Sequence, residues 1–490
     1  MSSRNRWLVL AIVSSALFLI VIDMTVLYTA LPRLTHDLAA TGTEKLWIVN
    51  AYPLVVAGLL PGLGGLGDRV GHKRMFLYGL IVFGLASLAA AFSPSPSILI
   101  ASRVVLAIGA AMMMPATLSL IRLTFTDEKE RAFAIGIWAA VASGGAALGP
   151  VIGGLLLEWF WWGSVFLINV PVVFLAFVSG ALILVNKRAT HPHPFDLIGS
   201  VQVMAALVGL ISAVKEVSKP EPSLPLAGLT FALGLIAMTA FVSRQRASAN
   251  PLIDFDLFRN AQFTSGVIAA LVASAALIGV ELVFSQRLQL VLGLSPLQAG
   301  LMVLPIPIAS FLAGPLTGLA LPHLGAARVL SGALALTGIA LAIYFLTYHG
   351  PAWLWLSILA VMGVGIGATM TAASSVIMQS APEEHAGMAA SIEEVSFELG
   401  GALGIAILGS AMTMLYTRSM SVPANVPATA ADSLDEALLA AEALPARAAA
   451  QLAATARNAF DEAFVGVIAL ATILVFGAAI GIWRKAANNS

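Results

Sequence analysis

Cysteine and charge are what this 490-residue sequence lacks: it has no cysteine, and Asp, Glu, Lys and Arg make up only 10% of it. Without cysteine the chain can form no disulfide, no thiolate metal site and no cysteine nucleophile. Soluble domains contain about 25% charged residues, so a soluble protein of this composition would expose large apolar patches and aggregate. The zero net charge gives no reason to expect a nucleic-acid partner. No phosphate-binding lysine motif or zinc pair is found, so we expect no cofactor, no metal and no ATP-driven transport by this chain alone.

Hydrophobic residues are abundant, at 59% of the sequence. They form apolar blocks of about 20 residues from end to end, each long enough to cross roughly 30 Å of hydrocarbon as a helix. The first block, from Trp7 to Leu31, is too long for the core of a signal peptide and is interpreted as an uncleaved span. The sequence therefore predicts an all-α polytopic membrane protein with fourteen spans, near 8–31, 46–66, 75–92, 98–121, 133–157, 164–185, 197–215, 224–243, 263–286, 297–320, 328–348, 353–379, 388–415 and 463–483.

The distribution of basic residues predicts the orientation. An even number of spans puts both termini on one side, and the segments on that side hold 16 of the 25 lysines and arginines. The positive-inside rule therefore places both termini in the cytoplasm. The sizeable loop at about 416–462 then lies outside. Its sequence Ser433-Leu434-Asp435-Glu436 has the form of a capping box, and Pro445 interrupts an alanine-rich run, which predicts a hairpin of two short helices. A disordered tether is the alternative.

An internal repeat relates the second span to the tenth. At a constant offset of 254 residues, five glycine, proline and arginine positions recur in register. Duplicated halves are a common plan in transporters, with the substrate site between them near the membrane midplane. The offset predicts a six-helix bundle at 1–190, two inserted spans at 191–250 and a second six-helix bundle at 251–490. The matching pairs are Pro53 and Pro307, Pro61 and Pro315, Gly64 and Gly318, Gly71 and Gly325, and Arg74 and Arg328.

The loop after the second span reads GGLGDRVGHKR (64–74). Its glycines allow a tight turn and close packing, Asp68 can face a positive helix N-terminus, and its basic residues hold it at the cytoplasmic side. The pattern resembles the signature of the major facilitator superfamily, which implies a loop that locks one face of the transporter until it rearranges. The matching conformational residues are Gly64, Asp68, Arg69, Gly71 and Lys73.

Two further runs lie inside spans. Arg103, in RVVLAIGAA, cannot be neutralised and is costly in lipid, so it must face the protein interior, water or a carboxylate. A rival interpretation has it snorkelling to the outer headgroups. The run GGAALGPVIGG (144–154) places glycines every four residues for close helix packing and a proline at a kink point. Both runs resemble superfamily signatures, the first implying proton coupling and the second export rather than import. The residues of the second are Gly145, Gly149, Pro150, Gly153 and Gly154.

Four acids lie in otherwise apolar spans: Asp23 in the first, and Glu393, Glu394 and Glu398 in SIEEVSFELGG (391–401). Acids at the centre of a span cost about 2.5–3.5 kcal/mol each, so they need a counter-charge, protons or a water-filled cavity. Glu394 and Glu398 are one helical turn apart and share a face, whereas Glu393 points elsewhere. Such a cluster suits an exchanger, in which protons and a cationic substrate take turns on the same groups. For Asp23, a polar helix–helix contact is the alternative.

The runs IDMTVLYTALP, EKLWIVNAYPL and SIEEVSFELGGALG closely resemble the fourteen-span drug:proton antiporters of this superfamily, over essentially the whole chain. The resemblance is to exporters of quaternary ammonium compounds and methyl viologen. It implies that Asp23, the three glutamates and Arg103 serve cation recognition or proton coupling. This sequence departs from the pattern at two positions: relatives often have Asp at the position of Asn50, and some carry an acid in the tenth span, near Ser310. The loss of these acids is expected to narrow the response to dications.

Other residues are candidates for lining the substrate path. Ring faces of Tyr52, Trp138 and Phe397 could contact an organic cation. Glu281 lies in the outer half of the ninth span and is expected either to serve function or to pair with Arg287 at that edge. The partners expected are organic cations, protons and membrane lipid, and the chain is expected to be a monomer. The alternatives are a proton-coupled nutrient importer on the same fold and a membrane receptor that moves nothing.

Overall fold

The computed structural model describes residues 3–487 except residues 39, 41, 187–195, 218–221, 249–250, 252, 295, 383–385, 424–425 and 432–433. The described chain is helical and contains no strand, so the predicted all-α class is confirmed. Ser433, the first residue of the expected capping box, lies outside the described residues.

Each of the fourteen predicted spans falls on a long helix or, for the sixth and tenth, on a pair of helices. Among the described residues, eleven helices are long and apolar enough to cross a membrane, or twelve if the bent helix α5 is one span. Helices α2 and α8 contain shorter apolar stretches, Ala51–Leu60 and Ile198–Leu210, so fourteen spans stays a prediction. The first nine helices are α1 (Ser3–Asp37), α2 (Gly42–Val70), α3 (His72–Ala91), α4 (Pro96–Thr124), α5 (Glu128–Trp159), α6 (Ser164–Leu167), α7 (Asn169–Ile183), α8 (Leu197–Val217) and α9 (Leu224–Ala247).

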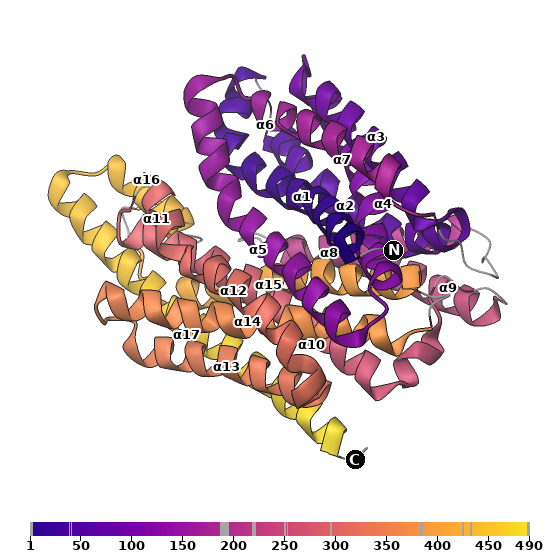
Figure 1. The fold of residues 1–490 in the computed structure, drawn as a ribbon. Coiled ribbons are helices and arrows are strands. Elements are labelled where there is room, and N and C mark those ends of the chain that lie inside the picture. Colours follow the sequence, from indigo (N-terminus) through magenta and orange to yellow (C-terminus); the bar gives the residue numbers. More distant parts are fainter. Residues whose placement is uncertain are drawn as a thin grey trace.

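The second part of the chain begins with a long helix that ends in a π-helical turn at Arg287–Val291. Figure 1 shows the orange and yellow helices of this part packed beside the indigo and magenta helices of the first part. Both termini lie toward the end of the bundle away from α16 (Figure 1). The helices are α10 (Ala261–Gln286), α11 (Pro296–Val303), α12 (Pro305–Leu324), α13 (Ala326–Thr347), α14 (Ala352–Ser380), α15 (Ala386–Ser419), α16 (Leu434–Glu442) and α17 (Ala446–Ala487).

Buried apolar side chains form two large clusters. One comes mainly from α1–α7 with the first turns of α15, and the other mainly from α10–α17. Helices α8 and α9 pack on each other, where Gly209 meets Gly234, and α8 lies against α2, where Met204 covers Gly58. The predicted boundaries at 190 and 250 stay a prediction.

Glycines set how closely the long helices approach. Helices α5 and α12 cross where Gly136 faces Gly314, and a Cβ atom on either would collide with the other's backbone. The matched glycines Gly71 and Gly325 both have positive φ, 100° and 81°, in the turns that precede α3 and α13. Positive φ at both repeat positions explains why both are glycine, because a Cβ atom disfavours that conformation.

The expected outer hairpin differs from the structure in one respect. Helix α16 is short and packs on α17, but the second helix of the hairpin is the first part of α17, which continues without a break to Ala487. Pro445 precedes this helix, and its carbonyl oxygen accepts a hydrogen bond from the backbone N–H of Ala449. Proline is tolerated at a helix start, and the alanine-rich sequence after it has high helix propensity, so nothing ends the helix before the span.

Candidate functional site

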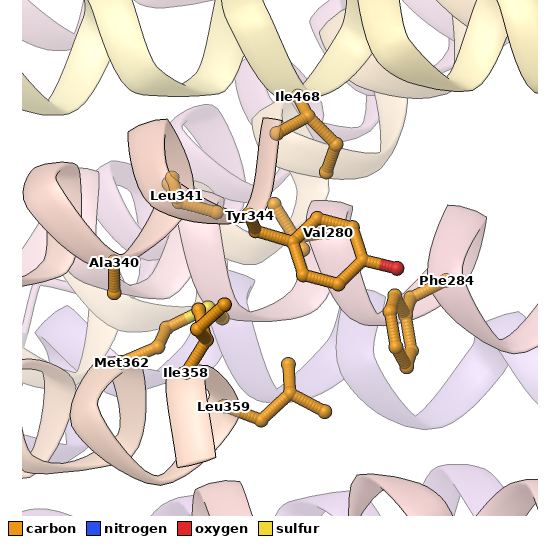
Figure 2. A pocket seen from close by; sticks show the side chains of 9 residues that line it. All are labelled: Val280, Phe284, Ala340, Leu341, Tyr344, Ile358, Leu359, Met362 and Ile468. Carbon is orange, nitrogen blue, oxygen red and sulfur yellow. The ribbon is translucent and has the colours of Figure 1, made fainter. Parts of the chain in front are cut away.

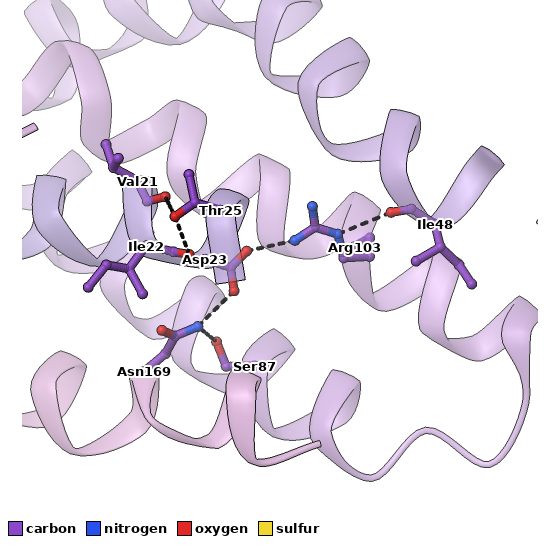
Figure 3. Close-up of polar contacts among 8 residues, drawn as sticks. All are labelled: Val21, Ile22, Asp23, Thr25, Ile48, Ser87, Arg103 and Asn169. Atoms are coloured by element: carbon purple, nitrogen blue, oxygen red, sulfur yellow. Dashed lines mark hydrogen bonds and ion pairs between the residues drawn. The ribbon is translucent and has the colours of Figure 1, made fainter. Parts of the chain in front are cut away.

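Asp23 of α1 and Arg103 of α4 form a buried ion pair, with 2.6 Å between Asp23 Oδ2 and Arg103 Nη1. Both residues are at most 2% exposed. Arg103 Nε also donates to the backbone oxygen of Ile48 at 3.3 Å, and its guanidinium lies 4.5 Å from the centre of the Tyr52 ring. These contacts fix the arginine in the protein interior, and Figure 3 shows those with Asp23 and Ile48. The alternative in which Arg103 snorkels to the headgroups is therefore wrong. Its charge is compensated by the neighbouring carboxylate of Asp23, so the side chain does not need to reach the water at the membrane surface.

The second oxygen of Asp23 contacts a residue that the sequence did not single out. Asn169 Nδ2 donates to Asp23 Oδ1 at 2.9 Å and to Ser87 Oγ at 3.2 Å. Asn169 is completely buried at the start of α7, and Ser87 on α3 is also completely buried. An asparagine inside an apolar span was the available sequence signal, because a buried amide needs a polar partner.

The three glutamates of α15 lie together, and two are deeply buried. Glu393 accepts a hydrogen bond from Ser374 Oγ of α14. Glu393 Oε2 and Glu394 Oε1 have no hydrogen-bond partner in the described part of the chain. Glu394 interacts electrostatically with both Glu393 and Glu398, and Glu398 is half-buried. The cluster thus has acceptor oxygens to spare and no basic side chain bonded to it among the described residues.

Tyr52 lies within electrostatic range of both groups of acids, and its hydroxyl has no hydrogen-bond partner among the described residues. It is 1% exposed on α2, and it interacts electrostatically with Asp23, Arg103 and Glu398. Asp23 and Arg103 belong to the first part of the chain, whereas Glu398 belongs to α15. Helix α15 packs on both α2 and α4. The structure therefore brings the predicted acids of both parts toward one region between them.

The other residues expected to line the substrate path differ in their exposure and in their hydrogen bonds. Trp138 is 4% exposed and donates from Nε1 to Thr117 Oγ1 at 3.1 Å. Ser310 is buried where α12 meets Gly367 of α14, and its hydroxyl has no partner in the described residues. Phe397 is half-buried, and its backbone oxygen accepts from Ser274 Oγ at 2.6 Å. The side chain of Asn50 lies outside the described residues.

Glu281 does not pair with Arg287. Arg287 Nε donates to Asp461 Oδ1 at 2.7 Å, and its guanidinium lies within 6 Å of the ring centres of Tyr348, Trp355 and Phe464. Six residues along a helix turn the side chain through about 600°, so Glu281 and Arg287 point in different directions. Glu281 is instead exposed on α10.

The run GGLGDRVGHKR (64–74), expected as a loop, is almost entirely helical: residues 64–70 are the end of α2, residues 72–74 begin α3, and only Gly71 stands between them. This run contacts the second part of the chain. Asp68 Oδ1 accepts from the backbone N–H of Gly387, in the first turn of α15, at 3.1 Å, and lies 3.1 Å from His72 Nε2. This is the helix N-terminus contact that the sequence predicts for Asp68. Gly64 packs against Gly387, leaving no room for a Cβ atom.

Of the basic residues in this run, Lys73 of α3 donates to the backbone oxygen of Ala181 at 2.8 Å, and Arg69 of α2 is exposed. Nearby, Arg122 of α4 donates to the backbone oxygen of Ala381. We name the contacts of Asp68, Gly64 and Arg122 across the two parts the latch.

The glycine-rich run of α5 packs on α1. Gly145 faces Val21, and Gly149 faces Thr25 so closely that a Cβ atom would collide with it. Gly153 is buried, whereas Gly154 is exposed. The helix bends by 44° between Glu128–Ala146 and Val151–Trp159. Pro150 lies in the break between these segments, as expected for a proline that removes a backbone donor.

A small apolar cavity lies elsewhere, within the second part of the chain. Figure 2 shows side chains of α10, α13, α14 and α17 around it. With no charged residue among them, this cavity lacks the groups that a cation or proton would need. Its lining residues are Val280, Phe284, Ala340, Leu341, Tyr344, Ile358, Leu359, Met362 and Ile468.

Comparison with known proteins gives extensive similarity. The family model of the Major Facilitator Superfamily matches residues 13–405 and 261–483. The chain is 41% identical to the methyl viologen resistance protein SmvA of Salmonella typhimurium, over 99% of both chains. It is 38% identical to the multidrug efflux pump LfrA of Mycolicibacterium smegmatis, over 97% of this chain and 95% of that protein.

Similarity extends to solved structures. The human organic anion transporter MFSD10 (TETRAN) matches 96% of this chain and 99% of its own, with a TM-score of 0.64 and 14% identity. At that identity the match shows the fold alone, and that fold agrees with the fold class that the sequence predicts.

Proposed function

The chain belongs to the major facilitator superfamily, and on that premise we propose that it exports hydrophobic organic cations in exchange for protons. It is a transporter rather than an enzyme. The substrates proposed are quaternary ammonium compounds, cationic dyes, viologens and biguanide-like dications. The similarity to a methyl viologen resistance protein and to a multidrug efflux pump supports this class.

One observation carries the proposal: carboxyl groups are buried between the two parts of the chain with oxygens that no described group satisfies. A buried acceptor without a partner costs about 1–3 kcal/mol, and more if it is charged. A protein that retains two such glutamates at membrane depth needs something that occupies them, and a proton or a cation suits an oxygen acceptor.

The two groups of acids suit different tasks. Asp23 is enclosed by Arg103 and Asn169, which leaves no free oxygen for a bulky cation, so we assign it to proton coupling. Glu393, Glu394 and Glu398 have unpaired or half-exposed carboxyl groups, so we assign them to cation binding and to the exchange of protons for the cation. Tyr52, in electrostatic contact with both groups, is the proposed link.

Exchange requires that the site open to one side at a time. We propose that two six-helix bundles rock about the acids, as a monomer in the bacterial inner membrane with both termini cytoplasmic. The latch then holds the cytoplasmic side closed. Protonation changes the relative stability of the two arrangements, and the ligand that binds one of them more tightly shifts the population toward it.

The test is transport by purified protein in proteoliposomes under an imposed pH gradient, with ethidium as a fluorescent monocation and a bis-quaternary dication. We expect movement of both cations opposite to the flow of protons. Asp23→Asn and Glu394→Gln should each lower the initial rate at least tenfold, about the factor expected for one lost interaction with a charged group.

Two exposed acids supply matched controls, Asp256→Asn and Glu442→Gln, which should transport like the wild type. Unchanged rates and pH dependence in both buried-acid variants would remove these acids from the mechanism. Net movement of cations in the same direction as protons would instead establish an importer.

A further inference from the structure

Asn169 lies between Asp23 and Ser87 with one atom of its amide facing both. The Nδ2 atom donates to Asp23 Oδ1 and to Ser87 Oγ, and the three side chains come from α7, α1 and α3 (Figure 3). The other amide atom, Oδ1, is buried and has no partner among the described residues. A completely buried amide that leaves its oxygen unpaired calls for an explanation, because most buried polar atoms are bonded.

The present orientation suits an ionised Asp23. A carboxylate only accepts hydrogen bonds, so the amide must present its N–H₂ group to it. Once Asp23 takes up a proton on Oδ1, that oxygen becomes a donor and the N–H₂ group faces it donor to donor. A half-turn of the amide brings Oδ1 of Asn169 to the same place, where it can accept.

Ser87 fits both orientations. A hydroxyl both donates and accepts, so Ser87 accepts from Nδ2 in the first orientation and donates to Oδ1 in the second. Asp23 Oδ2 keeps its bond from Arg103 in both states, because a protonated carboxyl group still has an acceptor oxygen. Both states of Asp23 therefore find two partners without any movement of a helix.

Among the described groups around Asp23, Asn169 is the one whose side chain can exchange a donor for an acceptor when Asp23 is protonated. The charged group that faces Asp23 is Arg103 from α4, and Tyr52 from α2 lies behind it, with Glu398 of α15 in its electrostatic range. Helices α3 and α7 contribute the neutral Ser87 and Asn169. Arginine cannot lose its proton in a protein, so it cannot follow the protonation of Asp23.

We propose that Asn169 is a positioning residue that holds Asp23 in both protonation states by turning its side-chain amide. The proposal rests on the proposed function only in that Asp23 gains and loses a proton. The proton enters and leaves on Asp23 Oδ1, and Asn169 exchanges none. No signature of the sequence includes this asparagine.

The direct test is infrared difference spectroscopy of the purified full chain in lipid, recorded between acid and alkaline pH with isotopically labelled asparagine. We expect an amide carbonyl band that changes together with the carboxyl band of Asp23. Asn169→Leu should remove the amide change, and Asp23→Asn should remove both. An Asp23 carboxyl band that changes with no accompanying amide change, or no titration of Asp23 at all, would overturn the proposal.

Transport gives a second readout. In Asn169→Leu both protonation states of Asp23 lose a partner, but the carboxylate loses the stronger hydrogen bond because it is charged. We therefore expect the pH profile of ethidium transport to move toward higher pH by about half a unit to one unit, the difference between a charged and a neutral hydrogen bond. Ser87→Ala, which is less disruptive to folding, should move it less in the same direction. Ser102→Ala is the matched control, since among the described residues that buried hydroxyl donates to the backbone oxygen of Ile98 in its own helix.

The outcomes separate this proposal from the proposed function. Profiles of Asn169→Leu and Ser87→Ala that superimpose on the wild type would overturn the role of Asn169 while cation export stands. A linked amide and carboxyl change in a wild type that moves no cation would leave the role of Asn169 supported and remove the export function.

Discussion

Ionisable side chains are buried in two different ways within this one molecule. Arg103 is bonded to Asp23, to the backbone at Ile48 and to the face of Tyr52, so its charge is compensated by fixed partners. Glu393 and Glu394 are equally buried but keep oxygens without described partners. The satisfied pair is suited to a fixed geometry that responds to one proton. The unsatisfied pair is suited to a ligand that comes and goes.

At Arg103 the planar guanidinium is the feature that matters. Arg103→Lys keeps the positive charge but loses the several donors and the flat face that stacks on Tyr52. We expect the free energy of unfolding to fall by about 1.5–3 kcal/mol, the range for a hydrogen bond to a charged group, and the transport rate to fall at least tenfold. Thermal unfolding in detergent and the proteoliposome assay measure both. Arg259→Lys, at an arginine whose side chain is 84% exposed, is the control and should change neither.

Asp196, before α8 and outside the spans, gives a prediction about pH. Hydrogen bonds from Arg244 hold its pKa below the usual value of 3.8. A depressed pKa means that the pair stabilises the fold above the unfolded value and loses this contribution as pH falls through the folded value. Asp196→Asn should therefore lower the melting temperature at pH 7 and converge with the wild type below pH 3.8. If the melting temperatures of Asp196→Asn and the wild type differed equally at pH 7 and below pH 3.8, the charge of Asp196 would not contribute to stability.

At the scale of the element, close helix crossings decide which helices can move together. One close crossing between the two parts joins α5 and α12, where Gly318 lies against Ala132 and Gly314 against Gly136. Its repeat partner Gly64 makes the equivalent approach to α15. Both members of the matched pair thus mark crossings between the parts, which agrees with a duplicated unit.

The crossing of α5 and α12 predicts a sharp contrast between two glycines. Gly318→Val would drive a side chain into the backbone of α5, so the helices must separate, and we expect transport to fall at least tenfold. Gly332→Val on α13 meets open space and should transport normally. Proteoliposome rates, at equal amounts of inserted protein, measure the contrast. Normal transport by Gly318→Val would show that α5 and α12 can separate without loss of transport, which would contradict the prediction.

For the whole molecule, the latch fixes which end of the bundle is closed in the described arrangement. Asp68 bonds α2 to the first turn of α15, and Arg122 bonds α4 to the end of α14. Ser391, one turn further along α15, is 1% exposed behind these contacts. Opening this end must break them, and it must therefore expose Ser391.

Because the chain has no cysteine, a single engineered one reports this opening without background. We expect Ser391→Cys to react slowly with a thiol reagent, and the added change Asp68→Asn to speed the reaction about tenfold or more, the population shift for one hydrogen bond to a charged group. Asp256→Asn, at an exposed acid, is the control. Equal reaction rates would show that Asp68 does not hold the closed state.

Sequence and structure each account for part of this site. The apolar blocks predict where helices lie, and the expense of charge in lipid singles out Asp23, Arg103 and the glutamates. Asn169 was missed because asparagine carries no charge and nothing in its own helix shows what it faces. Of the two options for Glu281, pairing with Arg287 is wrong. Nearness in sequence suggested it, whereas Arg287 contacts Asp461, 174 residues away.

The sequence by itself determined that this protein lies in a membrane and that it contains an internal repeat, since hydropathy and a constant offset are properties of the chain alone. It also determined that Gly71 and Gly325 stand at turns, because local backbone geometry follows local residues. Only the tertiary structure decided which oxygen of Asp23 meets which partner, that α16 and α17 form one hairpin with the last span, and that Asp68 reaches Gly387. Those contacts join residues far apart along the chain, and their partners follow from how whole helices pack.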